Sequence, residues 1–330
     1  MTGKRKILKE EILSSVAGDL AGIEKALADN LAPRLALVSD IAGHLLFSGG
    51  KRLRPLMMVL SARMCRCTDH DVIRFSTIFE YLHAATLLHD DVVDEAEMRR
   101  GKRAAHLTWG AAGVVLTGDF LLARSLSIAA LTRKPDIIDI VAGITEAMSQ
   151  GEIDQLDKKG KIDLSEQEYM AVIQAKTAVL IRGACRSGAV LAGADPDRVT
   201  ALSDFGFHLG VAFQMADDLL DYTADVKTLG KNPGADIREG KLTLPLIHAL
   251  ARAGRDDRDK IEAMIKDPRL SAEAFEELAA LLHHYGGIAY TQEKAREHVK
   301  EAKNCLEKFD PSRERDIMMM LADYAIARDL

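Results

Sequence analysis

The spacing of apolar residues constrains the fold of this chain more than any other feature. Over long stretches apolar residues recur every three or four positions, as on one face of an α-helix. No stretch shows the sustained alternation that a half-buried strand requires. The sequence therefore predicts an all-α fold. The expected helices lie near residues 10–30, 32–48, 55–67, 71–95, 112–133, 136–157, 165–194, 197–223, 241–253, 257–267, 271–284, 287–308 and 312–328.

The composition and the positions of the polar loops indicate one large globular unit. Of the 330 residues 48% are hydrophobic and 28% are charged, which supplies a large core and excludes a disordered chain. Polar loops are expected at 96–105, 158–164 and 224–240, and none of them has the character of an interdomain linker. We therefore expect a single domain that covers residues 1–330.

Charge and cysteine content exclude several classes of protein. The net charge is −6, which argues against a general nucleic-acid-binding protein. No apolar run is judged to approach the roughly 18 residues that span a bilayer, so no transmembrane segment is expected. Cys65, Cys67, Cys185 and Cys305 form no disulfide or zinc pattern. Because no secretory signal is recognisable either, a cytoplasmic location is expected.

Two aspartate-rich segments carry the strongest chemical signal. LLHDDVVD contains Asp90 and Asp94, and FQMADDLLD contains Asp217 and Asp221. Each pair is spaced at i and i+4, so both carboxylates lie on one face of a helix. Either motif alone would also fit a solvated helix face, but both are predicted mid-helix among apolar residues. Clustered carboxylates in such surroundings need a cation, and oxygen-only sites suit Mg²⁺ that also binds substrate phosphates.

Basic residues that would bind phosphates lie nearby in the sequence. GGKRLRP places Lys51, Arg52 and Arg54 between two glycines and a helix-starting proline, which favours a phosphate site at a helix N-terminus. Arg99 and Arg100 follow the first aspartate motif, and arginine matches diphosphate oxygens in a bidentate manner. The sequence thus predicts a site for a diphosphate and a metal.

The ordered set of motifs resembles the trans-type polyprenyl diphosphate synthases, with long-chain octaprenyl- or decaprenyl-like members as the nearest type. The resemblance covers about residues 50–245 and rests on GGKRLRP at 49–55, His83, DDVVD at 90–94, RRG at 99–101, Lys176-Thr177, FQMADDLLD at 213–221, Gly230-Lys231 and Gly240-Lys241. One departure is Lys102-Arg103-Ala104-Ala105, where the family often has proline followed by Ser or Thr.

The resemblance implies a reaction, a fold and a role for each matching residue. The reaction is head-to-tail condensation of isopentenyl diphosphate with an allylic prenyl diphosphate, on a helical bundle around a central cavity, in a homodimer. The implied Mg²⁺ ligands are Asp90, Asp94, Asp217 and Asp221. The implied contacts to the allylic diphosphate or its carbocation are Arg99, Lys176, Thr177, Gln214, Lys231 and Lys241. The implied isopentenyl diphosphate site is Lys51, Arg54, His83 and Arg100. The catalytic residues among these are Asp90, Asp94, Asp217, Lys176 and Arg99.

Small residues before the first motif predict a long product, as in quinone side chains. Thr86 lies four residues before Asp90 on the same helix face, and Ala85 is added through the resemblance, because short-chain members often have bulky aromatics there. Both would line an apolar tunnel for the growing chain. Candidates for the tunnel floor are Leu122, Ser125, Leu126 and Ala129, and segment 224–240 is a candidate lid.

Three other functions remain open from sequence alone. A short-chain farnesyl or geranylgeranyl synthase would carry the same motifs. A class I terpene cyclase would need no second diphosphate site, so GGKRLRP and Arg100 argue against it. A non-catalytic partner subunit usually lacks one aspartate motif, whereas this sequence contains both. Neither the preferred allylic primer nor the product length is fixed by these motifs.

Overall fold

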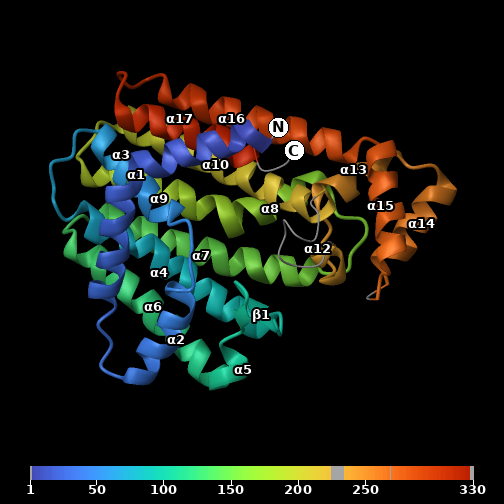
Figure 1. Cartoon of the computed structure of the whole chain (residues 1–330), viewed down its shortest axis with the longest axis horizontal. Coiled ribbons are helices and arrows are strands. Elements are labelled where there is room, and N and C mark those ends of the chain that lie inside the picture. Colours follow the sequence, from blue (N-terminus) through green and yellow to red (C-terminus); the bar gives the residue numbers. More distant parts are fainter. Residues whose placement is uncertain (1, 224–233, 268, 328–330) are drawn as a thin grey trace.

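The computed structural model describes residues 2–223, 234–267 and 269–327, and these form a bundle of helices (Figure 1). The first half contains α1 (Thr2–Leu31), α2 (Ala36–Leu46), α3 (Leu53–Met64), α4 (Val72–Val93), α5 (His106–Trp109), α6 (Ala111–Leu131) and α7 (Pro135–Lys158). The middle contains α8 (Glu166–Ile173), a π-helical turn (Gln174–Ala178), α9 (Val179–Leu191) and α10 (Pro196–Thr223). The last part contains α12 (Ala235–Arg238), α13 (Leu244–Arg252), α14 (Arg255–Ile265), α15 (Ala272–His284), α16 (Gly287–Leu306) and α17 (Arg313–Ile326). The predicted all-α class is confirmed.

Three local features differ from the expected elements. Helix α1 begins at Thr2 rather than near residue 10, and the helix expected over 165–194 is divided by the π-helical turn. The loop expected at 96–105 contains a small hairpin, in which β1 (Met98–Arg99) pairs antiparallel with β2 (Lys102–Arg103). Arg100 and Gly101 form its turn with φ of 51° and 74°, as a type I′ turn requires.

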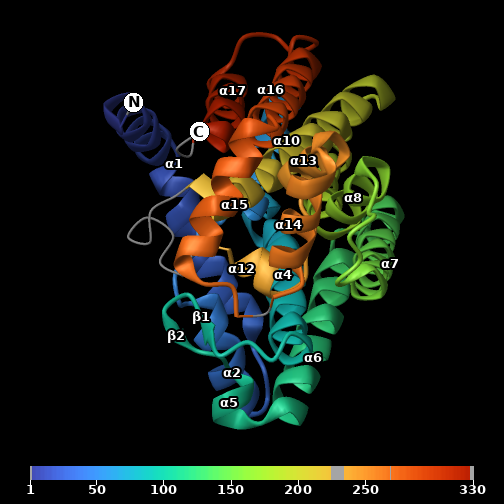
Figure 2. The ribbon, with the colours of Figure 1, turned by 90° about the vertical axis from the view of Figure 1, so that its right-hand side faces the viewer.

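Helices α4 and α10, which carry the aspartate motifs, are buried in the bundle. Figure 2 shows α4 running through the middle of the molecule, and it packs against α3 and α6. Helix α10 packs against α9 on one side and α16 on another. Its residues enter two hydrophobic cores, one reaching from α1 to α7 and one formed with α8 and α13–α16. This packing holds the ends of α4 and α10 in fixed positions.

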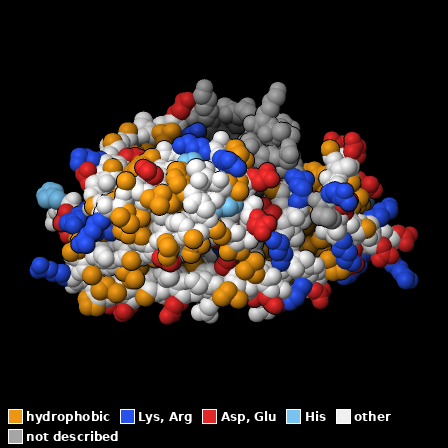
Figure 3. Space-filling view, turned by 90° about the horizontal axis from the view of Figure 1, so that it is seen from below, with side chains coloured by type: hydrophobic (Ala, Val, Ile, Leu, Met, Phe, Trp, Pro, Cys, Tyr) orange, Lys and Arg blue, Asp and Glu red, His pale blue; other side chains and the backbone are white. Residues whose placement is uncertain are grey.

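Helix α6 departs from the expectation that no apolar stretch is long enough to cross a membrane. Its 21 residues meet that test by length and composition, although a core helix of a soluble protein would pass it as well. Helix α6 packs on α4 and α7 within the bundle, but Val115, Leu116, Leu126 and Leu131 remain exposed on it. Figure 3 views the side on which α2, α5 and α6 lie in Figure 1, and hydrophobic side chains spread over that face.

Candidate active site

Both aspartate motifs lie at the C-terminal ends of their helices, not mid-helix as expected. Asp90 is in the last turn of α4 and Asp94 caps that helix, while Asp217 and Asp221 are in the last two turns of α10. The C-terminal end of a helix carries partial negative charge, so carboxylates are unfavourable there unless a cation offsets them. This placement strengthens the argument that the motifs bind cations.

The first aspartates of the two motifs line one cavity together with several of the predicted basic residues. The cavity has a volume of about 370 Å³. Besides Asp90 and Asp217, its predicted site residues are Arg54, His83, Thr86, Lys176, Thr177 and Gln214. A smaller adjoining cavity of about 140 Å³ is lined by Asp94 and Lys241, and it shares Lys176, Thr177 and Gln214 with the first. The fold thus brings together residues that lie far apart in the sequence.

Asp90 has a carboxylate that is incompletely neutralised by the protein. Burial raises its pKa to about 6, against the opposing effect of Lys176, and the nearby carboxylates of Glu152 and Asp94 raise it further. The Nζ atom of Lys176 lies 3.9 Å from Oδ2 of Asp90 but 2.6 Å from Oε2 of Glu152. The site therefore has an excess of negative charge around Asp90, which a divalent cation would neutralise.

Lys176 and Thr177 owe their position to the π-helical turn between α8 and α9. Such turns interrupt α-helices most often at functional sites. Two glycines let this turn pack closely, because a Cβ on Gly151 would lie 2.6 Å from Cβ of Ala175, and a Cβ on Gly210 would lie 2.6 Å from Cα of Ala178. The turn therefore packs closely against both α7 and α10.

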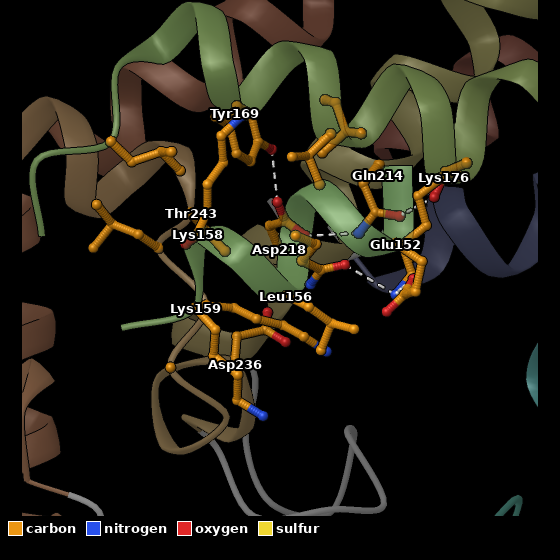
Figure 4. A pocket seen from close by; sticks show the side chains of 18 of the residues that line it. Glu152, Leu156, Lys158, Lys159, Tyr169, Lys176, Gln214, Asp218, Asp236 and Thr243 are labelled. Atoms are coloured by element: carbon orange, nitrogen blue, oxygen red, sulfur yellow. Dashed lines mark hydrogen bonds and ion pairs between the residues drawn. The ribbon is translucent and has the colours of Figure 1, made fainter. Parts of the chain in front are cut away.

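A chain of hydrogen bonds connects this turn to the second aspartate motif (Figure 4). Thr177 donates from Oγ1 to Oε1 of Gln214 over 2.7 Å, and Gln214 donates from Nε2 to Oδ1 of Asp218 over 2.8 Å. Tyr169 donates from its hydroxyl to the other oxygen of Asp218 over 2.6 Å. Asp218 is buried and lines the smaller cavity, and because both of its carboxylate oxygens accept hydrogen bonds it fixes the amide of Gln214.

The remaining aspartates of the two motifs have different surroundings. The Nζ atom of Lys241 lies 4.0 Å from Asp94 and 2.6 Å from Glu239. Burial lowers the pKa of Lys241, but Glu239 and Asp94 outweigh it and the pKa is raised. Asp221 accepts backbone hydrogen bonds from Ala235 and Asp236 and so caps α12, while the metal role expected of it stays a prediction.

Arg54 and His83 form a buried basic site on the cavity wall. Burial lowers the pKa of Arg54, and its buried Nε atom has no hydrogen-bond partner. Burial also lowers the pKa of His83 to well below its usual value, and Arg54, Arg100 and Arg99 lower it further. The imidazole of His83 is therefore neutral and lies near several arginines. The positive charge of these arginines is what a bound anion would neutralise.

The other predicted cations are held in several ways. Arg99 donates from Nε to Oδ1 of the buried Asp91 over 2.7 Å. Arg100 donates to the carbonyl oxygens of Leu45 and Gly49, and Lys51 lies over the ring of Tyr324 at 5.8 Å. Arg52, which the sequence grouped with the phosphate site, instead turns into the core and pairs with Glu24 and Glu80. Lys231 lies outside the described residues.

The predicted chain-length residues separate into two groups. Thr86 and Leu122 line the cavity. Ala85, Ser125 and Ala129 are buried but are not among its lining residues, and Leu126 is exposed at the surface. Thr145 and Met148 on α7, which the sequence analysis did not name, lie on the cavity wall. The tunnel proposed from sequence therefore has its best structural support at Thr86.

Several other residues of the site were missed by sequence reasoning. They are Glu80, Glu152, Gln155 and Tyr169, whereas Asp91 and Asp218 lie inside the two predicted motifs, which gave them no separate role. Glu152 and Gln155 gave a weak signal, since their spacing of three places them on one face of α7. Tyr169 gave none, because its partner Asp218 is 49 residues away.

Comparison with known proteins gives a consistent result. A family model described as polyprenyl synthetase matches residues 36–282. The chain is 35% identical over 320 residues to the octaprenyl diphosphate synthase of Escherichia coli, covering 97% of this chain and 99% of that protein. It is 37% identical to an all-trans-nonaprenyl-diphosphate synthase of Rhodobacter capsulatus, covering 97% and 98%. A polyprenyl synthase from Caulobacter crescentus, crystallised with calcium and isoprenyl diphosphate, is 39% identical, covers 97% and 98%, and has a TM-score of 0.91.

Proposed function

Because the chain belongs to the polyprenyl synthetase family, we propose that it condenses isopentenyl diphosphate with an allylic prenyl diphosphate to make a long-chain all-trans product. The observation that carries this proposal is the arrangement around one cavity. Asp90 and Asp217 line it together with Lys176, while Arg54 and His83 form a separate basic site on its wall. Two diphosphates in one reaction need two such sites.

The residues present fit Mg²⁺ as the metal. The candidate donors are the carboxylates of Asp90, Asp94 and Asp217, and hard oxygen donors suit Mg²⁺. Among the described residues no three acidic, histidine or cysteine side chains converge as a closed metal site. Substrate phosphates would therefore complete the coordination, as is usual for Mg²⁺. When bound, Mg²⁺ would stabilise the negative charge on the leaving diphosphate.

The side chains divide the remaining work between the two substrates. Lys176, Arg99 and Lys241 would hold the allylic diphosphate while its bond to carbon breaks. Thr177 donates its proton to Gln214, so lone pairs of its hydroxyl oxygen remain to face the allylic cation. Arg54, His83, Arg100 and Lys51 would hold isopentenyl diphosphate so that its double bond attacks this cation. A proton then leaves to an oxygen of the released diphosphate, and no side-chain base is needed.

A test separates this proposal from a terpene cyclase. Release of diphosphate from farnesyl diphosphate is measured with purified protein and Mg²⁺, with and without isopentenyl diphosphate. The proposal expects release to depend on isopentenyl diphosphate, with one further diphosphate for each unit added. Full release without isopentenyl diphosphate would indicate a cyclase instead. No activity from the chain alone would favour a partner subunit.

We also propose that two copies pair through the exposed apolar face of α6 and α7. This face contains Val115, Leu116, Leu126, Leu131, Ile138 and Ile153, all of which are exposed in the single chain. Exposed apolar side chains gathered on two packed helices are typical of a protein interface, and a homodimer places the same residues on both copies. Leu116→Glu should shift the sedimentation coefficient from dimer to monomer, while Ile7→Glu on α1 should not. A wild-type monomer would refute the proposal.

A further inference from the structure

The carboxylate of Asp221 spans from α10 to the start of α12. Its Oδ1 accepts a hydrogen bond from the backbone N–H of Ala235 over 3.2 Å, and its Oδ2 accepts one from Asp236 over 3.0 Å. Its backbone carbonyl accepts a third from Gly234 over 3.1 Å. Asp221 is only 2% exposed, so these contacts form away from water. One residue thus binds three consecutive residues of another segment.

These contacts satisfy groups that the short helix cannot satisfy itself. The first N–H groups of any helix lack partners within it, and an aspartate oxygen is among the best acceptors for them. Gly234, which precedes α12, has no side chain to supply that acceptor, and Asp221 supplies it from 13 residues earlier in the sequence. The cap therefore comes from the second aspartate motif.

The capped segment leads directly to Lys241. The N–H of Lys241 donates to the carbonyl of Asp236 over 2.8 Å, and the carbonyl of Gly240 accepts from Gly160 over 2.9 Å. Both ends of the turn after α12 are therefore fixed. From there the ammonium of Lys241 reaches to 4.0 Å from Asp94 at the end of α4.

We infer that Asp221 is a positioning residue, which caps α12 and thereby holds Lys241 opposite the first aspartate motif. This inference rests on the proposed function, and it assigns the second motif two different tasks. Asp217 faces the shared cavity, whereas Asp221 faces the backbone of α12. The i, i+4 spacing of the two residues hence serves to bind a ligand and to hold the start of α12.

Substitution by asparagine distinguishes this role from metal binding. Asparagine keeps one of the two side-chain acceptors that Asp221 uses, whereas alanine keeps neither. A metal ligand behaves differently, because asparagine lacks the charge that Mg²⁺ requires. Asp221→Asn should therefore weaken the cap of α12 less than Asp221→Ala does, while Asp217→Asn serves as the matched variant for loss of a metal ligand.

The first measurement is amide hydrogen exchange of residues 234–241 in the protein without substrate. Asp221→Ala should raise the exchange rate about tenfold or more, and Asp221→Asn should raise it by less than Asp221→Ala does. Equal rates in wild type and Asp221→Ala would overturn the inference. This measurement does not depend on the reaction, so it decides the inference even where the proposed function fails.

The second measurement is the affinity for an allylic diphosphate with Mg²⁺, by titration calorimetry. Asp221→Ala should weaken binding about tenfold, and Asp221→Ala combined with Lys241→Ala should bind no more weakly than Lys241→Ala alone. If the double variant instead loses affinity by the product of the two single losses, the two residues act independently and the inference is contradicted. A loss of Mg²⁺ affinity in Asp221→Asn as large as that in Asp217→Asn would make Asp221 a metal ligand after all.

Discussion

Arg52 donates a hydrogen bond from Nη1 to Oε1 of Glu80 over 2.6 Å, and the two side chains are 2% and 6% exposed. Arg52 also binds Glu24 on α1 through its Nε atom over 2.6 Å. Its neighbour Arg54 is partly buried, and its buried Nε atom has no hydrogen-bond partner. Two arginines in one motif therefore differ in role, one stabilising the fold and one left for a ligand.

The matched substitutions Arg52→Met and Arg54→Met should change stability in opposite directions. Arg52→Met leaves the buried carboxylate of Glu80 unpaired, so the free energy of unfolding should fall by about 3–5 kcal/mol. Arg54→Met removes a charge whose burial already lowers its pKa, so the free energy of unfolding should rise. Urea unfolding of both variants tests this, and a similar loss of stability in both would contradict the assignment.

The two diphosphate sites should respond separately to substitution. Arg54→Ala and Lys51→Ala should raise KM for isopentenyl diphosphate by about ten- to hundredfold, because each removes a charge-assisted contact. Arg99→Ala should act mainly on the allylic substrate. Steady-state kinetics with each substrate varied in turn will show this. Equal weakening of one substrate by all three variants would refute the division.

The metal-binding role of the first aspartates predicts a large loss of turnover with little loss of fold. Asp90→Asn and Asp217→Asn should each lower kcat by several orders of magnitude at saturating Mg²⁺, while thermal melting remains cooperative. Near wild-type turnover in either variant would exclude the substituted aspartate as a metal ligand.

The raised pKa of Asp90 also predicts that the stability of the metal-free protein depends on pH. Its pKa is about 6 in the folded protein, above the usual value of 3.8, so the folded state binds more protons between pH 4 and 6. The protonated carboxyl of Asp90 therefore contributes to the free energy of unfolding below about pH 4. That contribution is lost as the pH rises through 6. In EDTA, Asp90→Asn should therefore melt higher than wild type at pH 7, by more than at pH 4.5. A difference that does not change with pH would contradict this.

The sequence predicted the helices and most of the site because these depend on local patterns. Residues such as Asp90 and Lys176 lie in motifs whose spacing can be read directly. The roles of Arg52 and Asp221 could not be read, since each is decided by partners on other helices. Glu80 is 28 residues from Arg52, and the amides that Asp221 caps are 14 and 15 residues away. Residue type and spacing do not reveal which way a side chain turns.

The chain-length residues predict different outcomes for neighbouring substitutions. Thr86→Phe places a ring in the cavity and should shorten the main product while the first condensation continues. Ala85 is fully buried away from the cavity lining, so Ala85→Phe should mainly destabilise the protein, by about 1–3 kcal/mol from overpacking. Mass spectrometry of products, with thermal melting, separates the two. Unchanged product length in active Thr86→Phe would remove this residue from the tunnel wall.

The most direct test of the proposed function is the length of the product. Purified protein is incubated with farnesyl diphosphate, excess isopentenyl diphosphate and Mg²⁺, and the products are dephosphorylated and sized by mass spectrometry. The account predicts a series that ends at octaprenyl to decaprenyl alcohol and is absent when EDTA replaces Mg²⁺. Products that end at geranylgeranyl, or that form without isopentenyl diphosphate, would contradict it.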